Sequence, residues 1–268
     1  MTTNGRICYT EAMDERLDYH RLLDGDIPPW VMRFIKTTGK AINQQQMIQG
    51  GDSILLSVSG GKDSLALALA LSVRRKWLPI DYRLSALMIN WIEHPIPPES
   101  RAPLAEYFGA LDIDFIIIDE NQFSPSFVGE FNCYLCARNR RRILFSYCDE
   151  HGIRKVAMGH HLDDLVETSL INTCFRGRFE TMRPVQSFFD GKLFIIRPMI
   201  LIHESTTKRL ATAYSIPVIK PVCPYDQTNV RARLKPIVSD LAKIDKLTRE
   251  HIYHAHGFSD TIKSKCVD

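Results

Sequence analysis

A run of six residues between an apolar segment and a helical pattern has the composition of a phosphate-binding loop. The run is Ser59-Gly60-Gly61-Lys62-Asp63-Ser64. Glycines let the backbone approach phosphate oxygens, free amides at the start of a helix donate to them, and Lys62 adds positive charge. The hydroxyls of Ser59 and Ser64 can also donate, and Asp63 is placed to help hold Mg²⁺. The spacing differs from the Walker pattern, and a tight strand-to-helix turn without a ligand is the alternative interpretation.

A second polar run follows another short apolar segment. It reads Gly159-His160-His161-Leu162-Asp163-Asp164 and continues to Glu167-Thr168. Because parallel strands end at the same edge of a sheet, these polar groups are expected to face the same crevice as the loop. Asp163 and Asp164 could bind magnesium or orient an activated substrate. Two adjacent carboxylates also commonly cap the start of a helix, so that alternative stays open.

A pair of cysteines at Cys-x-x-Cys spacing opens a further helical pattern. Cys133 and Cys136 are followed by four arginines, Arg138, Arg140, Arg141 and Arg142. A helix N-terminus lowers the pKa of a thiol and favours the thiolate that binds metals. By itself the pair could be half of a zinc site, a redox couple or two buried cysteines. The seven cysteines are odd in number and no export signal is recognisable, which argues against a disulfide framework.

The elements that would position these residues alternate between strand and helix patterns. The expected strands cover residues 53–60, 84–91, 115–119, 155–159 and 193–200, and helices are expected after the loop and at 99–111, 133–152 and 162–175. This alternation predicts an α/β fold with a mostly parallel sheet, helices on both faces and ligands at the carboxyl ends of the strands. We expect an N-terminal helical extension at 1–40, a central domain at 41–222 and a basic helical extension at 223–268.

The composition limits the class of protein. The chain has 268 residues, 45% of them hydrophobic and 24% charged, as in soluble globular proteins. No run of about 18 uncharged apolar residues is present, so we expect a cytoplasmic protein without a membrane partner. A net charge of +3 does not indicate a nucleic-acid binder by itself, and any RNA surface must come from local clusters of arginine and lysine.

The loop at 59–64 resembles the signature of the PP-loop ATP pyrophosphatases, which cleave ATP to AMP and pyrophosphate while adenylating a substrate oxygen. The fold implied is the adenine nucleotide alpha hydrolase-like fold. The block at 159–168 is similar to that of the tRNA 2-thiocytidine synthetase branch of this family, as is the position of the cysteine pair. The resemblance implies that residues 59–64 bind ATP. It assigns the catalytic roles to Lys62, Asp63, Asp163 and Asp164.

The same branch places a third cysteine after the last strand, and here Cys223 lies in the run Pro221-Val222-Cys223-Pro224-Tyr225-Asp226. Asp226 stands where the family often has a further cysteine. The resemblance implies a [4Fe-4S] cluster held by Cys133, Cys136 and Cys223. Three protein ligands for four irons leave one iron free to bind sulfide, whereas a structural zinc site takes four ligands.

The function implied by the resemblance is ATP- and Mg²⁺-dependent thiolation of tRNA, in which the C2 oxygen of an anticodon-loop cytidine is adenylated and replaced by sulfur. The implied partners are tRNA and a sulfur donor, such as a cysteine desulfurase or free sulfide; a homodimer is one option for the assembly. The arginines of the helix at 133–152 and of Arg176-Gly177-Arg178 either contact RNA or form solvated faces. Two other functions stay open. One is a PP-loop ligase that amidates or aminates an adenylated substrate, and the other is a zinc or redox nucleic-acid-binding protein without catalysis.

Overall fold

The computed structural model describes residues 18–123, 127, 133–219 and 230–258. Cys223, the run Pro221–Asp226 around it, Cys8 and Cys266 lie outside the described residues. None of the helices in the described ranges is long and apolar enough to cross a membrane.

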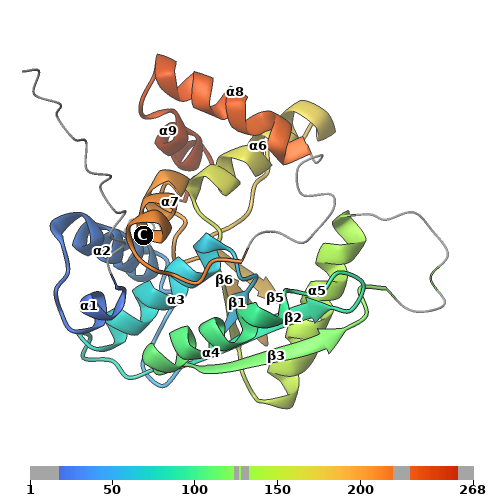
Figure 1. Ribbon diagram of the computed structural model, residues 1–268. Coiled ribbons are helices and arrows are strands. Elements are labelled where there is room, and N and C mark those ends of the chain that lie inside the picture. Colours follow the sequence, from blue (N-terminus) through green and yellow to red (C-terminus); the bar gives the residue numbers. More distant parts are fainter. Residues whose placement is uncertain (1–17, 124–126, 128–132, 220–229, 259–268) are drawn as a thin grey trace, which may run out of the picture.

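A six-stranded sheet with the order β3-β2-β1-β4-β6-β5 forms the centre of the molecule (Figure 1). The neighbouring strands pair in parallel, except for β5 and β6, which are antiparallel. The strands are β1 (Ser53–Val58), β2 (Arg83–Trp91), β3 (Asp114–Glu120), β4 (Lys155–Met158), β5 (Val185–Phe188) and β6 (Leu193–Ile196). The predicted α/β fold with a mostly parallel sheet is therefore confirmed.

Helices cover both faces of this sheet. They are α1 (His20–Leu23), α2 (Pro29–Gln44), α3 (Lys62–Arg75), α4 (Arg101–Ala110), α5 (Cys133–Glu150), α6 (Leu162–Arg176), α7 (Glu204–Ala213), α8 (Val230–Ile244) and α9 (Thr248–Ala255), with a 3-10 turn η1 (Pro98–Ser100) before α4. On one face α3 packs on β1 and α4 on β3, with α2 and α7 against α3; on the other face α5 packs on β4. The helices α6, α8 and α9 contact one another and form a separate group (Figure 1).

The alternation of side chains along the central strands explains why both faces need cover. In β1, Ile54 and Leu56 belong to the core shared with α2, α3 and α4, while Leu55 belongs to the core beneath α5. In the register of the sheet, Leu56 lies opposite Ala86 of β2 and Ala157 of β4. A parallel strand that is apolar at every position is stable only when both faces of its sheet are buried. Ile54, Leu55 and Leu56, which are apolar and buried on both faces, therefore place this segment in a central strand.

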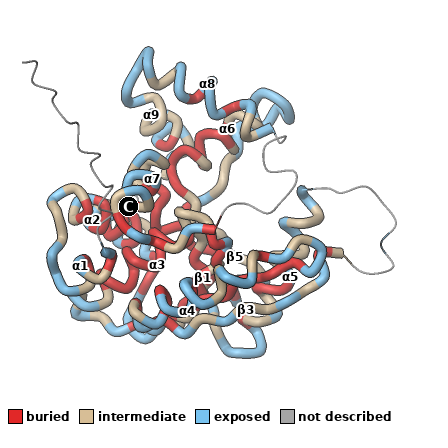
Figure 2. Tube along the Cα trace, in the orientation of Figure 1, coloured by how far each residue is buried: buried red, intermediate tan, exposed pale blue. Residues whose placement is uncertain are grey.

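The helix α3 is buried along almost its whole length, from Ser64 to Arg74 (Figure 2). Tyr107 of α4 donates a hydrogen bond to the Leu65 carbonyl at 2.9 Å, and Tyr82 donates to the Leu71 carbonyl at 2.8 Å. These contacts fix the helix along its length. Its N-terminal residue Lys62 is thereby held at the end of β1.

The structure differs from the sequence expectation at the hairpin of β5 and β6. The strand β5 was not predicted, and β6 ends at Ile196 rather than at residue 200. Pro198 has no backbone N–H and cannot continue the ladder. Phe189 and Asp190 adopt left-handed φ angles of 52° and 53° before Gly191. An Asp-Gly turn of this kind is a sequence signal for a tight hairpin, so β5 was detectable from Asp190-Gly191.

The strand order brings the two predicted motifs to one place. From β1 the chain continues to β2 and β3 on one side of the sheet, while β4 and β6 lie on the other side. In an open α/β sheet, such a reversal leaves a crevice at the carboxyl ends of the two central strands. The runs after β1 and β4 both begin at this crevice. The helix α2 passes residue 40 without a break, and its Val31, Phe34 and Ile35 lie in the same core as α3.

Candidate active site

The loop after β1 is shaped by its glycines and its own hydroxyl groups. Gly60 has a φ of +75°, which glycine adopts without strain, and a β-carbon there would lie 3.0 Å from the Ile219 side chain. The Ser64 hydroxyl donates to the Gly61 carbonyl at 2.9 Å, and the Gly61 amide donates to the Ser59 hydroxyl at 3.3 Å. The helix α3 begins at Lys62. The expected context of strand, glycine turn and helix N-terminus is therefore present.

The Lys62 ammonium lies between two carboxylates. Its Nζ is 2.9 Å from Asp63 Oδ2 and 3.0 Å from Glu204 Oε1 at the start of α7. The same Glu204 oxygen accepts a hydrogen bond from Lys235 of α8 at 2.9 Å. Burial disfavours the charge of Glu204, but the hydrogen bonds from Lys235 and Lys62 outweigh it and lower the pKa of this carboxyl to about 2. Glu204 is thus ionised at neutral pH and orients Lys62 at the mouth of the loop.

The end of β4 touches the loop directly at Gly159. A β-carbon at this position would lie 2.9 Å from both the carbonyl carbon of Asp63 and the amide nitrogen of Ser64. Only glycine allows the two backbones to approach so closely. Two residues later, His161 Nε2 lies 3.8 Å from Asp63 Oδ1. The two runs singled out from the sequence therefore form one site.

His161 and Asp164 begin α6 with a reciprocal pair of hydrogen bonds. The His161 side chain accepts from the Asp164 amide at 3.3 Å, and the Asp164 carboxylate accepts from the His161 amide at 3.0 Å. Arg231 of α8 donates to the other Asp164 oxygen at 3.0 Å. Although burial disfavours its charge, nearby His161 and Arg231 hold the pKa of Asp164 below its usual value. Asp164 therefore caps the helix and also carries a negative charge in the crevice.

The adjacent Asp163 is engaged differently. Its two oxygens accept hydrogen bonds from Arg249 of α9 at 2.5 Å and from the Glu204 amide at 2.7 Å. The side chain is 10% exposed and is not part of the cavity wall described below. Asp163 thus connects the starts of α6 and α7 to the C-terminal helix α9.

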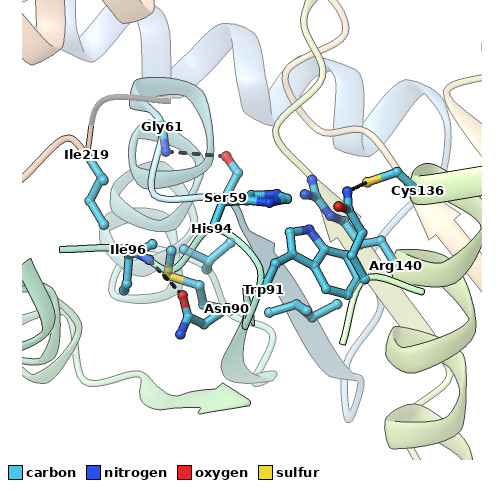
Figure 3. A pocket seen from close by; sticks show the side chains of 13 residues that line it. Ser59, Gly61, Asn90, Trp91, His94, Ile96, Cys136, Arg140 and Ile219 are labelled. Carbon is cyan, nitrogen blue, oxygen red and sulfur yellow. Dashed lines mark hydrogen bonds between the residues drawn. The ribbon is translucent and has the colours of Figure 1, made fainter. Parts of the chain in front are cut away.

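Two cavities meet at the loop. The smaller has a volume of about 250 Å³ and an apolar wall from the ends of β1 and β2, with Trp91, Asn90 and Cys136 among the side chains that line it (Figure 3). The larger, about 470 Å³, is lined by the loop, Asp63, Asp164, Gly159 and His160. Ser59 and Arg140 line both cavities, so the two spaces are adjacent.

The wall of the larger cavity is rich in cations. Four arginines line it, namely Arg140, Arg141, Arg197 and Arg231. Arg197 is buried and donates to His160 Nδ1 at 3.2 Å. Burial lowers the pKa of His160 to about 4, so this imidazole is neutral at pH 7 and accepts the hydrogen bond. Burial also lowers the pKa of Arg197 to about 10, which leaves the guanidinium charged. A polyanionic ligand is the natural occupant of such a wall.

The cysteine pair lies on the first turn of α5. Cys133 is exposed, while Cys136 is partly buried and lines the smaller cavity. The Cys136 sulfur accepts a hydrogen bond from the side-chain amide of Gln122 at 2.9 Å, and Asn139 donates to the Gln122 carbonyl at 2.7 Å. Within the described residues, no group of three or more His, Cys, Asp or Glu side chains could hold a metal ion. The third predicted ligand, Cys223, lies outside those residues.

Comparison with known proteins identifies the family. A family model described as a PP-loop domain matches residues 33–241. The tRNA-cytidine(32) 2-sulfurtransferase of Dichelobacter nodosus is 34% identical over 242 residues, which cover 88% of each chain. That of Marinobacter nauticus is 34% identical over 208 residues, covering 75% of this chain and 67% of the relative. This chain belongs to the tRNA-cytidine(32) 2-sulfurtransferase family of PP-loop proteins. The predicted resemblance is confirmed.

A solved structure shows that the fold is that of a PP-loop thiolase. The U34-tRNA thiolase NcsA from Methanococcus maripaludis, described with its [4Fe-4S] cluster, matches with a TM-score of 0.69. The match covers 88% of this chain and 81% of that one at 21% identity. At this identity, the similarity supports the PP-loop fold of the sulfurtransferase family without assigning residues.

Several residues of the site were not predicted from the sequence of this family member. Glu204, Arg197, Arg231 and Arg249 all contact predicted site residues. Glu167 of the second polar run was identified, but not the rise of its pKa to about 7, which burial and the Asp164 carboxylate cause. A polar residue at a helix start just after a strand was the available signal for Glu204, because α7 follows β6 at the same sheet edge. The arginines of α8 and α9 gave no such signal.

The close approach at Gly159 gives a first testable prediction. Gly159→Ala should weaken ATP binding by about ten- to a hundredfold, because displacing the Asp63 and Ser64 backbone should cost about one hydrogen bond to a charged phosphate, or about 1.5–3 kcal/mol. Overpacking should also lower the free energy of unfolding by about 1–3 kcal/mol. Calorimetric titration with ATP and denaturant unfolding measure the two effects.

The matched control for this variant is Gly109→Ala in α4. A β-carbon there meets no atom within 4 Å. Alanine is a better helix former than glycine by about 0.5–1 kcal/mol, so Gly109→Ala should leave ATP affinity unchanged and should not destabilise the protein. Wild-type ATP affinity in the Gly159 variant would show that the two runs do not form one site.

Proposed function

We propose that this protein is an ATP-dependent sulfurtransferase that replaces the C2 oxygen of a tRNA cytidine, at position 32 as in its named relatives, by sulfur. The observation that carries the proposal is the contact between the glycine loop and Gly159, which joins an anion-binding helix start to a cation-lined cavity. Membership of the family supplies the substrate class. Arg197, which stays charged and donates to His160, supports an anionic ligand at this edge of the sheet.

ATP is proposed to span the two cavities. The smaller one offers an apolar wall for the adenine ring, with Met88, Ile89 and Ile96 among its residues. The pyrophosphate would lie on the backbone amides of Ser59–Ser64, where the start of α3 and Lys62 favour negative charge. Because Ser59 and Arg140 line both cavities, the α-phosphate would lie between them and face the larger one.

The target base would enter the larger cavity. Its C2 oxygen forms a bond to the α-phosphorus while the bond from that phosphorus to pyrophosphate breaks, and a sulfur at the sulfide oxidation level then displaces AMP. Lys62 and the loop amides stabilise the charge on the leaving pyrophosphate, as fixed donors do in such transfers. Arg140 and Arg197 lie where they can neutralise the adenylate. The neutral His160, held by Arg197, bounds this cavity without adding charge.

Magnesium has suitable oxygen ligands at this site. Asp63 and Asp164 both line the larger cavity, beside the proposed phosphates. Mg²⁺ usually takes one or two carboxylates together with substrate phosphates. We therefore assign these two aspartates to the metal. Asp163 does not line this cavity and is held by Arg249 and the Glu204 amide, so it is assigned a positioning role.

The cysteines fit a [4Fe-4S] cluster in their chemistry. Cys133 and Cys136 are one helical turn apart at the start of α5, where thiolates are favoured, and the amide of Gln122 donates to the Cys136 sulfur. Ile219 lines the same cavity as Cys136 and precedes Cys223 by four residues. Four residues span at most about 14 Å, a chain length that is compatible with Cys223 as the third ligand. When bound by Cys133, Cys136 and Cys223, the cluster would supply the sulfur for the exchange. The sulfur donor, a homodimer and a cytoplasmic location stay predictions.

Mass spectrometry of digested tRNA from cells with and without this gene tests the proposal. We expect loss of 2-thiocytidine from the anticodon loop, where an unpaired base presents its C2 oxygen without the few kcal/mol needed to unstack a paired one. With purified protein, tRNA should stimulate pyrophosphate release from ATP. Pyrophosphate release without any thionucleoside would favour a ligase, and the absence of both would favour a zinc or redox protein without catalysis.

A further inference from the structure

A third cavity lies between α5 and the β5–β6 hairpin. Its volume is about 1030 Å³, larger than that of either cavity at the loop. Five cationic residues line it, namely Arg138, Arg141, Arg142, Arg154 and Lys192. We call this surface the α5 groove. Among the described residues that line it, Asp149 is the only acidic one, so the wall of the groove is strongly positive.

Most of the cations of the α5 groove face solvent. Arg138, Arg142 and Lys192 are all exposed, and none of them forms an ion pair with a carboxylate of the described residues. Arg154 donates instead to the Gly191 carbonyl at 2.9 Å, which ties the end of the hairpin to the segment before β4. Unpaired surface arginines that surround one concavity are suited to bind phosphates.

Aromatic rings stand at the edges of the same groove. The side chains of Tyr134 and Phe189 line it and are 66% and 61% exposed. Phe145 lies beneath, with its ring centre 5.8 Å from that of Phe189 in an edge-on arrangement. Exposed aromatic faces beside cations are the usual platform for unstacked bases of single-stranded nucleic acid.

The α5 groove continues from the proposed reaction cavity. Arg141 lines both of them. Along α5, residues 134, 138, 142 and 145 follow one another at intervals of three or four positions, as do 138, 141 and 145, which places them on neighbouring parts of one helix surface. A nucleotide chain with one base in the reaction cavity therefore meets this surface next.

We propose that the α5 groove binds the RNA strand that flanks the target base, with its phosphates on Arg138, Arg142 and Lys192 and an unstacked base against Phe189. This inference rests on the proposed function, in which RNA is the substrate. A sulfur-donor protein is the rival occupant. The unpaired arginines and the exposed rings favour RNA, because a sugar-phosphate backbone with splayed bases offers both anions and flat apolar faces.

The test compares two charge-matched triple variants of the full-length, cluster-loaded protein. The first is Arg138→Ala, Arg142→Ala and Lys192→Ala, which spares Arg141 in the reaction cavity. The control is Arg33→Ala, Lys36→Ala and Lys40→Ala, surface cations of α2, which lies across the molecule from α5 (Figure 1). Fluorescence anisotropy with labelled tRNA measures Kd at several salt concentrations, and ATP binding is measured in parallel.

We expect the groove variant to bind tRNA at least about tenfold more weakly. The slope of log Kd against log salt concentration should fall by about 2, because each of three lost phosphate contacts contributes about 0.7 to that slope. Its ATP affinity should be unchanged, and the control should match wild type within about twofold. Phe189→Ala should weaken tRNA binding by about tenfold without changing the salt slope. Phe189→Trp should keep wild-type affinity, because its ring still offers a face for stacking.

Wild-type tRNA affinity in the groove variant, with thiolation by the wild-type protein intact, would overturn this inference and leave the proposed function standing. The inference is also overturned if the variant loses activity only when a donor protein, and not free sulfide, supplies the sulfur. Failure of the wild-type protein itself to bind or thiolate tRNA would instead overturn the proposed function, and this inference with it.

Discussion

Replacing Lys62 by alanine is expected to reduce ATP-dependent thiolation by about a hundred- to a thousandfold, the usual effect of removing one fixed donor from a developing negative charge. The Lys62 ammonium stands at the N-terminus of α3 and is oriented by Asp63 and Glu204. The fold should remain intact, because Glu204 keeps its hydrogen bond with Lys235. Pyrophosphate release and thionucleoside formation measure the loss.

The control for Lys62 is Lys76→Ala, at the other end of the same helix. Lys76 is exposed and donates to the Leu23 carbonyl, far from the loop, so activity should stay within about twofold of wild type. Alanine at Asp63 should also abolish thiolation, because that carboxylate holds Lys62 and is assigned to magnesium. Near-normal activity in both the Lys62 and the Asp63 variants would contradict the assignment of the loop.

Alanine at Cys133, Cys136 or Cys223 is expected to remove the iron–sulfur absorption and to abolish thiolation. Three ligands are the minimum set proposed here, and each would contribute one iron–thiolate bond to the cluster. ATP binding should persist in all three variants, since the loop and Lys62 are untouched. Iron and sulfide analysis of protein prepared without oxygen provides a readout that does not depend on activity.

Two other cysteines serve as controls for the cluster. Cys174 is exposed on α6, so Cys174→Ala should retain the full cluster and full activity. Cys148 is a fully buried residue of α5, and burial raises the pKa of its thiol to about 12. Cys148→Ala should retain the cluster and be mildly destabilised by the cavity it leaves. A complete cluster in the Cys223 variant would mean that the third ligand is a different residue.

The C-terminal helices α8 and α9 contact the carboxylates of the site directly, in addition to forming the basic extension that the sequence predicted. Arg231 and Lys235 of α8 contact Asp164 and Glu204, and Arg249 of α9 holds Asp163. The helices α8 and α9 pack on α6, whose first residues carry the two aspartates. The extension expected at 223–268 therefore supplies the cations that hold Asp163 in place and that lower the pKa values of Asp164 and Glu204.

The sequence by itself determined the local parts of this protein. Apolar runs bounded by glycine gave β1 and β4, and the residues after each run gave a helix start, because strand burial and glycine turns depend on a few neighbouring positions. It also determined that Lys62, Asp63 and Asp164 lie at the carboxyl edge of one sheet, since parallel strands share that edge. The cysteine pair at the start of α5 was likewise readable from spacing.

Only the tertiary structure decided which side chains meet. Glu204 is 142 positions from Lys62 in the sequence, and Arg249 is 86 positions from Asp163, so no local pattern could pair them. The difference between Asp163, held by Arg249, and Asp164, which faces the larger cavity, depends on where α9 and α8 pack. These ion pairs and cavities lie between elements that are distant along the chain. The distances between such elements are fixed by the packing of the helices on the sheet, and not by the spacing of residues along the sequence.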